Sequence, residues 1–170
     1  MPPPTHMDTT MGALINRTQY ERSLSYIASA RSDGARLATG GAHPKGAELA
    51  NGFFIEPTVF TGVTPAMKLA REEVFGPVLS VFRWSREDEV FDAVNGTELG
   101  LTASIWTRDL VTAHRAAARV QSGYVWVNDC SSHFIGAPFG GYKQSGLGRE
   151  ESKDELFEFT QIKNVNISMQ

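Results

Sequence analysis

The alternation of β-rich and helical patterns between residues 78 and 128 constrains the fold more than any other feature. β-rich runs occupy Val78 to Phe82, Thr102 to Trp106 and Tyr124 to Asn128. Helical patterns separate them, one from Ser85 to Asn95 and one from Asp109 to Val120. Strands joined by crossover helices run parallel, and the helices then cover the sheet. We therefore predict an α/β fold with a parallel sheet and flanking helices.

The region before this core predicts one helix and two irregular strands. Thr18-Gln19-Tyr20-Glu21 has the pattern of a capping box, and apolar residues follow at helical spacing until Gly34. Short strands are predicted at Phe53 to Ile55 and at Thr58 to Phe60. The proline between them cannot donate to a ladder, so a bend or a sheet edge is expected there.

The two ends of the chain read differently from its middle. Residues 1–11 begin with three prolines after Met1 and show no periodicity, which predicts a flexible tail. Residues 12–160 are assigned to one partial domain that includes an irregular Gly-rich stretch and a last helix starting at Ser152. Residues 161–170 alternate apolar and polar side chains, the period of a half-buried strand that needs a partner edge.

Charge and composition exclude several classes of partner and site. With 16 basic and 19 acidic residues the formal net charge is −3, so nucleic acid is not an expected partner. No apolar stretch is long enough to span a membrane and the first residues do not resemble a signal peptide, so we expect a soluble cytoplasmic protein. The histidines lack metal-ligand spacing, and Cys130 is the single cysteine, so no metal site is predicted.

Cys130 and His133 lie close enough in sequence to suggest a cysteine nucleophile with a histidine base. A separation of three residues does not establish that the thiol and the imidazole face each other. A lone cysteine more often packs as a small apolar residue, so we predict no catalytic use of Cys130. An unrelated cysteine hydrolase stays as an alternative that turnover of esters without a nicotinamide would reveal.

Four segments, in this order, resemble the aldehyde dehydrogenase superfamily. They are Gly52-Phe53-Phe54-Ile55-Glu56-Pro57-Thr58, Arg71-Glu72-Glu73-Val74-Phe75-Gly76-Pro77, Tyr124-Val125-Trp126-Val127-Asn128 and Pro138-Phe139-Gly140-Gly141-Tyr142-Lys143-Gln144-Ser145-Gly146. The resemblance covers the chain from about Gly12 to its end and corresponds to the C-terminal portion of such enzymes. It implies that residues 12–160 are part of a catalytic domain.

The resemblance also implies an NAD(P)-dependent oxidation of an aldehyde to a carboxylic acid. In the family a cysteine thiolate attacks the aldehyde, hydride passes to the nicotinamide, and a glutamate activates the water that releases the acid. The family places that cysteine, that glutamate and most of the NAD or NADP site upstream of the segments matched here. No catalytic residue is therefore expected in this chain, and the chain alone is predicted to be inactive.

What the resemblance assigns to this chain is cofactor contact and substrate contact. Glu73 is expected to accept hydrogen bonds from the nicotinamide ribose and Phe75 to pack against the nicotinamide ring, while Glu72 stays a surface charge. Phe139 is expected to line the substrate pocket, with packing in the core as the alternative. The preceding loop varies with substrate in the family, so Ser131 and His133 are interpreted as specificity residues.

The expected partners follow from the same resemblance. In the family a terminal strand joins the sheet of a neighbouring subunit, so residues 161–170 predict a homo-oligomer. The rest of an aldehyde dehydrogenase chain, or a complementary subunit, is expected to complete the enzyme. The alternative is a non-catalytic relict or split-subunit assembly module that pairs with a partner and turns nothing over by itself.

Overall fold

The computed structural model describes residues 4–169, and the chain divides into two compact units. The first runs to Ser85 and the second begins at Arg86. Residues 1–3 of the expected N-terminal tail, and Gln170 of the expected terminal strand, lie outside the described residues. Each unit is described below by itself.

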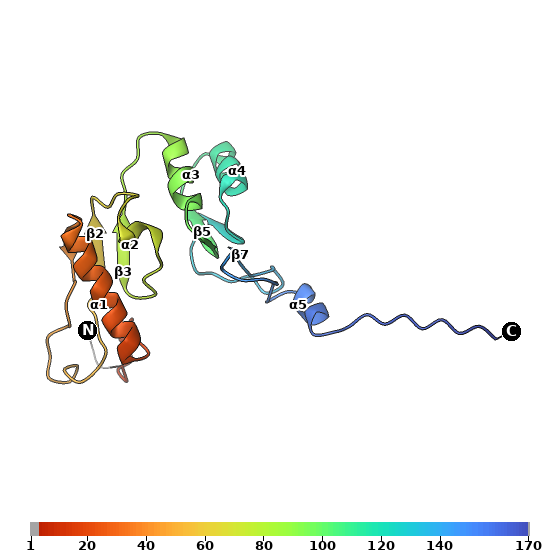
Figure 1. The fold of residues 1–170 in the computed structure, drawn as a ribbon, viewed down its shortest axis with the longest axis horizontal. Coiled ribbons are helices and arrows are strands. Elements are labelled where there is room, and N and C mark those ends of the chain that lie inside the picture. Colours follow the sequence, from red (N-terminus) through yellow and green to blue (C-terminus); the bar gives the residue numbers. More distant parts are fainter. Residues whose placement is uncertain (1–3, 170) are drawn as a thin grey trace. The chain divides into compact units, whose positions relative to one another are not determined.

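Helix α1, Arg17–Ser32, opens the first unit (Figure 1). Its N-cap is Asn16, whose side-chain oxygen accepts a hydrogen bond from the Gln19 N–H at 2.9 Å. The predicted capping box at Thr18 is therefore wrong by two residues, because Asn16 takes the capping position. Gly34 follows the helix with a positive φ of 89°, as the sequence predicted for its end.

The sheet of the first unit has the order β1-β2-β3, formed by Arg36–Thr39, Thr58–Thr61 and Val78–Val81. Strands β1 and β2 are antiparallel, whereas β2 and β3 are parallel and are connected through the short helix α2, Lys68–Arg71. The strand predicted at Val78 to Phe82 is confirmed as β3, but it pairs with β2 and lies in a different sheet from the two strands predicted after it. Strand β1 and helix α2 were not predicted, because four residues are too few to show a period.

The predicted strand at Phe53 to Ile55 is wrong, since the segment is irregular. Its backbone is satisfied elsewhere: the Leu14 N–H donates to the Phe53 carbonyl and the Glu56 N–H to the Ala42 carbonyl, both at 2.9 Å. Phe54 and Ile55 are buried, so the apolar run that looked like a strand serves packing without a ladder.

The core of the first unit joins one face of α1 to the sheet and to α2. Tyr26 and Ala30 complete the apolar face of α1, while Ala28, which fits the helical spacing, is exposed. The buried cluster consists of Tyr26, Ile27, Ala30, Ala35, Ile55, Phe60, Val63, Leu69 and Val74. Val74 belongs to the loop after α2, so the core fixes that loop at one point.

The second unit repeats the strand and helix alternation. Helix α3 spans Glu87–Asn95, β5 spans Thr102–Ile105, α4 spans Leu110–Arg119 and β6 spans Tyr124–Val127. Strands β5 and β6 pair in parallel across the α4 crossover, as predicted. The side chains of Arg115 and Arg119 on α4 bind Glu87 and Asp88 on α3 at 3.0 and 2.8 Å, which ties the two helices together.

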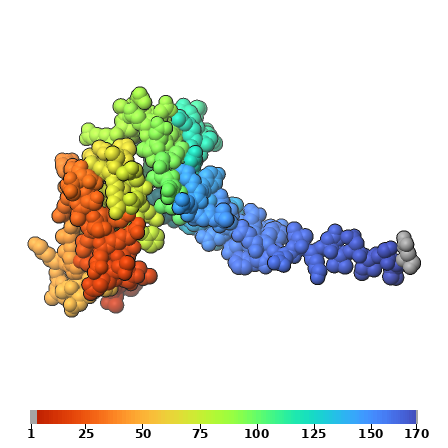
Figure 2. Space-filling view, viewed as in Figure 1, coloured from red at the N-terminus to blue at the C-terminus, as the bar shows by residue number. Residues whose placement is uncertain are grey.

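The Gly-rich stretch contains a strand that periodicity did not reveal. Strand β7, Tyr142–Lys143, pairs antiparallel with β4, Leu99–Gly100. Helix α5, Lys153–Glu158, begins after the N-cap Ser152, as predicted. Residues 160–169 form no helix or strand, and their side chains are exposed (Figure 2). The terminal strand therefore stays a prediction that depends on a partner.

Candidate functional site

Glu73 and Phe75 lie in the loop that leads from α2 into β3 of the first unit. Both side chains are exposed, 71% in the case of Phe75, whereas Val74 between them is buried in the core. Phe75 has a φ of 55°, a left-handed conformation that costs a non-glycine residue about 1–3 kcal/mol. Backbone conformations of this kind occur more often at ligand-binding sites, so the strain at Phe75, rather than its exposure alone, makes the loop a candidate site.

Helix α1 binds the backbone of this loop through two side chains one turn apart. The Gln19 amide nitrogen donates to the carbonyls of Val74 and Phe75 at 2.9 and 2.7 Å. The Arg22 guanidinium donates to the carbonyl of Glu73 at 2.8 Å. Three consecutive carbonyls are thus held from one side, and the side chains of Glu73 and Phe75 remain open to solvent.

Close packing between Gly76 and Ser23 also holds the loop against α1. Ser23 is fully buried, and a Cβ on Gly76 would lie 2.4 Å from its Oγ. Only a glycine allows the loop backbone to approach α1 this closely. The glycine in the Glu-Glu-Val-Phe-Gly-Pro motif is therefore explained by packing against the helix.

Glu72 has a structural partner that its sequence position did not indicate. Its carboxylate accepts a hydrogen bond from the buried Tyr26 hydroxyl at 2.7 Å and lies 3.9 Å from the Lys68 ammonium. Burial of the Tyr26 hydroxyl, together with this hydrogen bond to Glu72, raises its pKa above the usual value. Glu72 is exposed, as predicted, but it anchors the start of the loop as well.

His133 and Phe139 meet in an aromatic cluster of the second unit. Their ring centroids are 4.7 Å apart, and the Tyr124 ring of β6 lies 6.0 Å from His133 and 5.5 Å from Phe139. Trp126 completes the cluster at 6.2 Å from His133. Two of the three predicted pocket residues are therefore brought together by one strand.

The His133 ring is fixed by Glu151, which the sequence gave no reason to select. Both carboxylate oxygens of Glu151 lie within 2.7 and 2.8 Å of the His133 Nδ1. Glu151 itself has a φ of 64°, so its backbone is held in an unfavourable conformation beside the imidazole. The two residues are 18 positions apart, a distance at which no local pattern connects them.

Ser131 and Cys130 are exposed, and neither belongs to the aromatic cluster. Ser131 has a φ of 63°, and the Cys130 N–H donates to the Asp129 carboxylate at 2.7 Å. The His133 Nδ1 is engaged by Glu151. Within residues 4–169 the thiol of Cys130 and the imidazole of His133 form no hydrogen bond with each other, so the geometry gives no support to a nucleophile and base pair.

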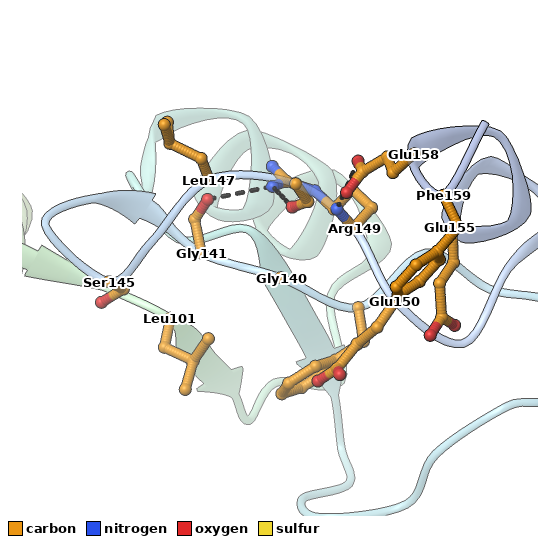
Figure 3. Close-up of a pocket in the computed structure, with 12 residues that line it drawn as sticks. Leu101, Gly140, Gly141, Ser145, Leu147, Arg149, Glu150, Glu155, Glu158 and Phe159 are labelled. Atoms are coloured by element: carbon orange, nitrogen blue, oxygen red, sulfur yellow. Dashed lines mark hydrogen bonds between the residues drawn. The ribbon is translucent and has the colours of Figure 1, made fainter. Parts of the chain in front are cut away.

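Phe139 also lines a hollow of about 330 Å³ within the second unit (Figure 3). The hollow is formed by the Gly-rich stretch together with Leu101, Glu155, Glu158 and Phe159. Arg149 donates to the Gly141 carbonyl at 3.0 Å and so braces one wall, as Figure 3 shows. The hollow mixes apolar surface with three glutamates, so it does not have the mostly apolar lining typical of a ligand pocket.

Two negative findings apply to residues 4–169. No group of three or more histidine, cysteine, aspartate or glutamate side chains is arranged to hold a metal ion in that range. Within the same range, no helix combines the length and the apolar character that crossing a bilayer requires.

A family model described as "Aldehyde dehydrogenase family" matches residues 1–165. The aldehyde dehydrogenase tropH of Talaromyces stipitatus is 54% identical over 168 residues, which are 97% of this chain and 33% of that protein. A betaine aldehyde dehydrogenase of Mesorhizobium japonicum is 48% identical over 164 residues, 96% of this chain and 34% of the relative. The chain thus spans about a third of the length of the curated relatives it matches.

Solved structures agree with the sequence relatives. The NAD+ complex of an aldehyde dehydrogenase from Bacillus cereus superimposes with a TM-score of 0.88 at 39% identity, covering 97% of this chain and 33% of that one. A betaine aldehyde dehydrogenase from Staphylococcus aureus in complex with NAD+ gives 0.86 at 40% identity, covering 91% and 31%. Each likeness extends over almost the whole chain.

Proposed function

This chain belongs to the aldehyde dehydrogenase family, and from that premise we propose that it supplies the nicotinamide clamp and part of the substrate pocket of an NAD(P)-dependent enzyme. The reaction is the oxidation of an aldehyde to a carboxylic acid. The rest of an aldehyde dehydrogenase chain, or a complementary subunit, supplies the nucleophilic cysteine and most of the dinucleotide site. The chain alone is inactive under this proposal.

The observation that carries the proposal is the exposure of Glu73 and Phe75 on a loop whose backbone is held from behind. A carboxylate accepts hydrogen bonds from vicinal hydroxyls such as those of a ribose, and a phenyl ring offers a face to a flat heterocycle. Both groups are free to do so, because Gln19 and Arg22 bind only the carbonyls of the loop. These residues therefore fit a nicotinamide nucleoside.

The bound NAD or NADP supplies the hydride acceptor, and the residues here supply position. Holding the nicotinamide in one orientation removes part of the entropic cost of bringing the reacting carbons together. The Bacillus cereus and Staphylococcus aureus relatives are described with NAD+. We propose that this chain serves a cofactor of the same class, NAD or NADP.

For the aldehyde, we propose that His133, Phe139 and Ser131 contact the substrate. The rings of His133 and Phe139, tilted by 30° to each other at 4.7 Å between centroids, offer apolar surface, and the pairing of His133 with Glu151 places a polar edge beside them. Such a mixed surface favours an aldehyde that carries an aromatic or polar group. Cys130 takes no part in the chemistry.

The decisive experiment measures NAD+ affinity and aldehyde-dependent reduction of NAD+ in the complete enzyme of which this chain is part. Replacing Glu73 with glutamine weakens the hydrogen bonds of a charged acceptor, and the Kd for NAD+ is expected to rise about tenfold. Glu72→Gln is the matched control, because its new amide oxygen still accepts from Tyr26 and NAD+ affinity should not change. Equal Kd values for all three proteins would refute the clamp.

The same preparation tests the excluded nucleophile and the alternative function. Cys130→Ser should leave turnover unchanged, and loss of turnover would make Cys130 catalytic after all. If no aldehyde reduces NAD+ with any companion protein present, the non-catalytic assembly module becomes the better description. The exposed apolar side chains of residues 161–169 favour that second function, because they are available to pair with a partner.

We also propose that the complete protein is a cytoplasmic homo-oligomer in which residues 161–170 pair as a strand with a neighbouring subunit. The alternation of Val165, Ile167 and Met169 with polar residues supports such pairing. Fractionation of cells with an antibody against residues 162–170 measures the compartment and the native mass together.

A further inference from the structure

The half-buried side chain of Gln19 on α1 binds the backbone of the loop that carries Glu73 and Phe75. Its Nε2 lies 2.9 Å from the carbonyl oxygen of Val74 and 2.7 Å from that of Phe75. These partners are 55 and 56 residues away in sequence. A primary amide nitrogen carries two hydrogens, so each carbonyl can receive one of them.

The two carbonyls flank the residue whose backbone is least favourable in the loop. Phe75 adopts a φ of 55°, which few side chains other than glycine and asparagine tolerate well. Such a conformation persists only when its surroundings enforce it. The Gln19 amide binds the carbonyls before and after the Phe75 Cα, and burial of Val74 in the core with residues of α1 holds the preceding residue.

Neighbouring residues on α1 bind the backbone of Gln19. Asn16 caps the turn that carries Gln19, and Ser23 donates to the Gln19 carbonyl at 2.9 Å. Arg22 donates to the carbonyl of Glu73 and to the Tyr26 hydroxyl, at 2.8 and 3.2 Å. The Gln19 side chain thus binds both carbonyls that bracket the left-handed turn.

We propose that Gln19 is a positioning residue of the nicotinamide clamp: its amide holds the turn at Phe75, so that the Phe75 ring and the Glu73 carboxylate are presented to the cofactor in a fixed orientation. This inference rests on the proposed function of Glu73 and Phe75. Gln19 acts through the loop backbone and needs no contact of its own with the cofactor.

The first test measures order in the loop without any cofactor. Backbone amide relaxation by NMR on the 170-residue chain should give order parameters of about 0.85 for residues 73–75, as for α1. In Gln19→Met, which keeps the length but loses both donors, they should fall below about 0.6 while α1 keeps its values. Gln19→Glu is the second variant, because a carboxylate of the same shape cannot donate to the carbonyls.

The control for this test is Gln161→Glu, which makes the same chemical change in the exposed segment after α5. It should leave the order parameters of residues 73–75 unaltered. If those residues stay as rigid in both Gln19 variants as in the parent chain, Gln19 does not position the loop and the inference is wrong.

The second test measures the Kd for NAD+ in the complete enzyme. Each Gln19 variant should raise the Kd about tenfold, a loss comparable to that of one net hydrogen bond, and Gln161→Glu should not. A loosened loop with an unchanged Kd would overturn the inference, because loop order would then not serve the cofactor. Glu73→Gln separates the two failures: if it raises the Kd, the proposed function of the clamp survives and only the role of Gln19 is lost.

Discussion

Two adjacent glutamates in this chain have different surroundings and so different roles. Glu73 extends a free carboxylate, while the carboxylate of Glu72 binds Tyr26, a residue 46 positions earlier. The resemblance to the family motif predicted Glu73 as a site residue. The hydrogen bond of Glu72 could not be predicted, because no local sequence pattern connects residues so far apart. Residues that support a site from another element, such as Gln19 and Arg22, escape prediction for the same physical reason.

Gly76→Ala should destabilise the chain by about 1–3 kcal/mol, because the new methyl group would lie 2.4 Å from the Ser23 Oγ and the surroundings must shift. Urea denaturation measures the difference. Gly12→Ala is the matched control, since a Cβ there meets nothing within 4 Å and the change should be within about 0.5 kcal/mol of neutral. In a Ser23→Ala background the penalty should shrink, and an undiminished penalty would argue against this contact.

The Tyr26 hydroxyl predicts a pH dependence of stability at high pH. Burial first, and the hydrogen bond to Glu72 second, raise the pKa of folded Tyr26 above its usual 10.0. The folded state then keeps its proton where the unfolded state loses it, so this stabilisation is complete below about pH 10 and disappears as the pH rises through the folded pKa. Tyr26→Phe lacks this group.

The measurement for Tyr26 is the urea midpoint of the parent chain and of Tyr26→Phe at a series of pH values. The parent should lose stability more steeply than the variant above about pH 10. Tyr142→Phe changes an exposed tyrosine and serves as the control. Parallel curves for the parent and Tyr26→Phe would contradict a raised pKa.

At the scale of helices and strands, the sequence predicted the elements that have recognisable capping or terminating residues and missed the short elements. Gly34 follows α1 in a left-handed conformation, and the Ser152 side chain caps the start of α5. Gly96 ends α3 with an ordinary φ of −75°, but a Cβ there would lie 2.7 Å from the Asp92 carbonyl oxygen. Strand β7 has two residues and helix α2 has four, so neither shows a period. The apolar run at Phe53 was predicted as a strand because a buried irregular segment and a buried strand have the same apolar residues.

The corrected start of α1 gives a prediction at the same scale. Asn16→Ala should lower the stability by about 1 kcal/mol, because the N–H of Gln19 loses its capping acceptor. Thr18→Ala should have little effect, since Thr18 lies inside the helix rather than at its cap. Thermal unfolding followed by circular dichroism compares the two, and a larger loss for Thr18→Ala would restore the capping box inferred from sequence.

At the scale of the whole molecule, we expect the exposed segment after α5 to control how the chain associates. The exposed fractions of Val165 and Ile167 are 66% and 79%, unusually high for apolar residues at strand spacing. The double change Val165→Lys with Ile167→Lys should reduce the mass of the complete enzyme in solution, measured by light scattering after size exclusion, because charged side chains oppose edge pairing. Lys163→Gln is a control for altered charge, and an unchanged mass in the double variant would exclude this segment from the interface.

The left-handed backbone at Phe75 should make selection for stability and selection for activity favour different residues at this position. A library screened only for expression should enrich glycine or asparagine at position 75, since both relieve an unfavourable backbone and an exposed ring contributes little to folding. A library screened for growth that depends on the enzyme should keep the aromatic ring. We therefore expect stability and activity to favour different residues at position 75.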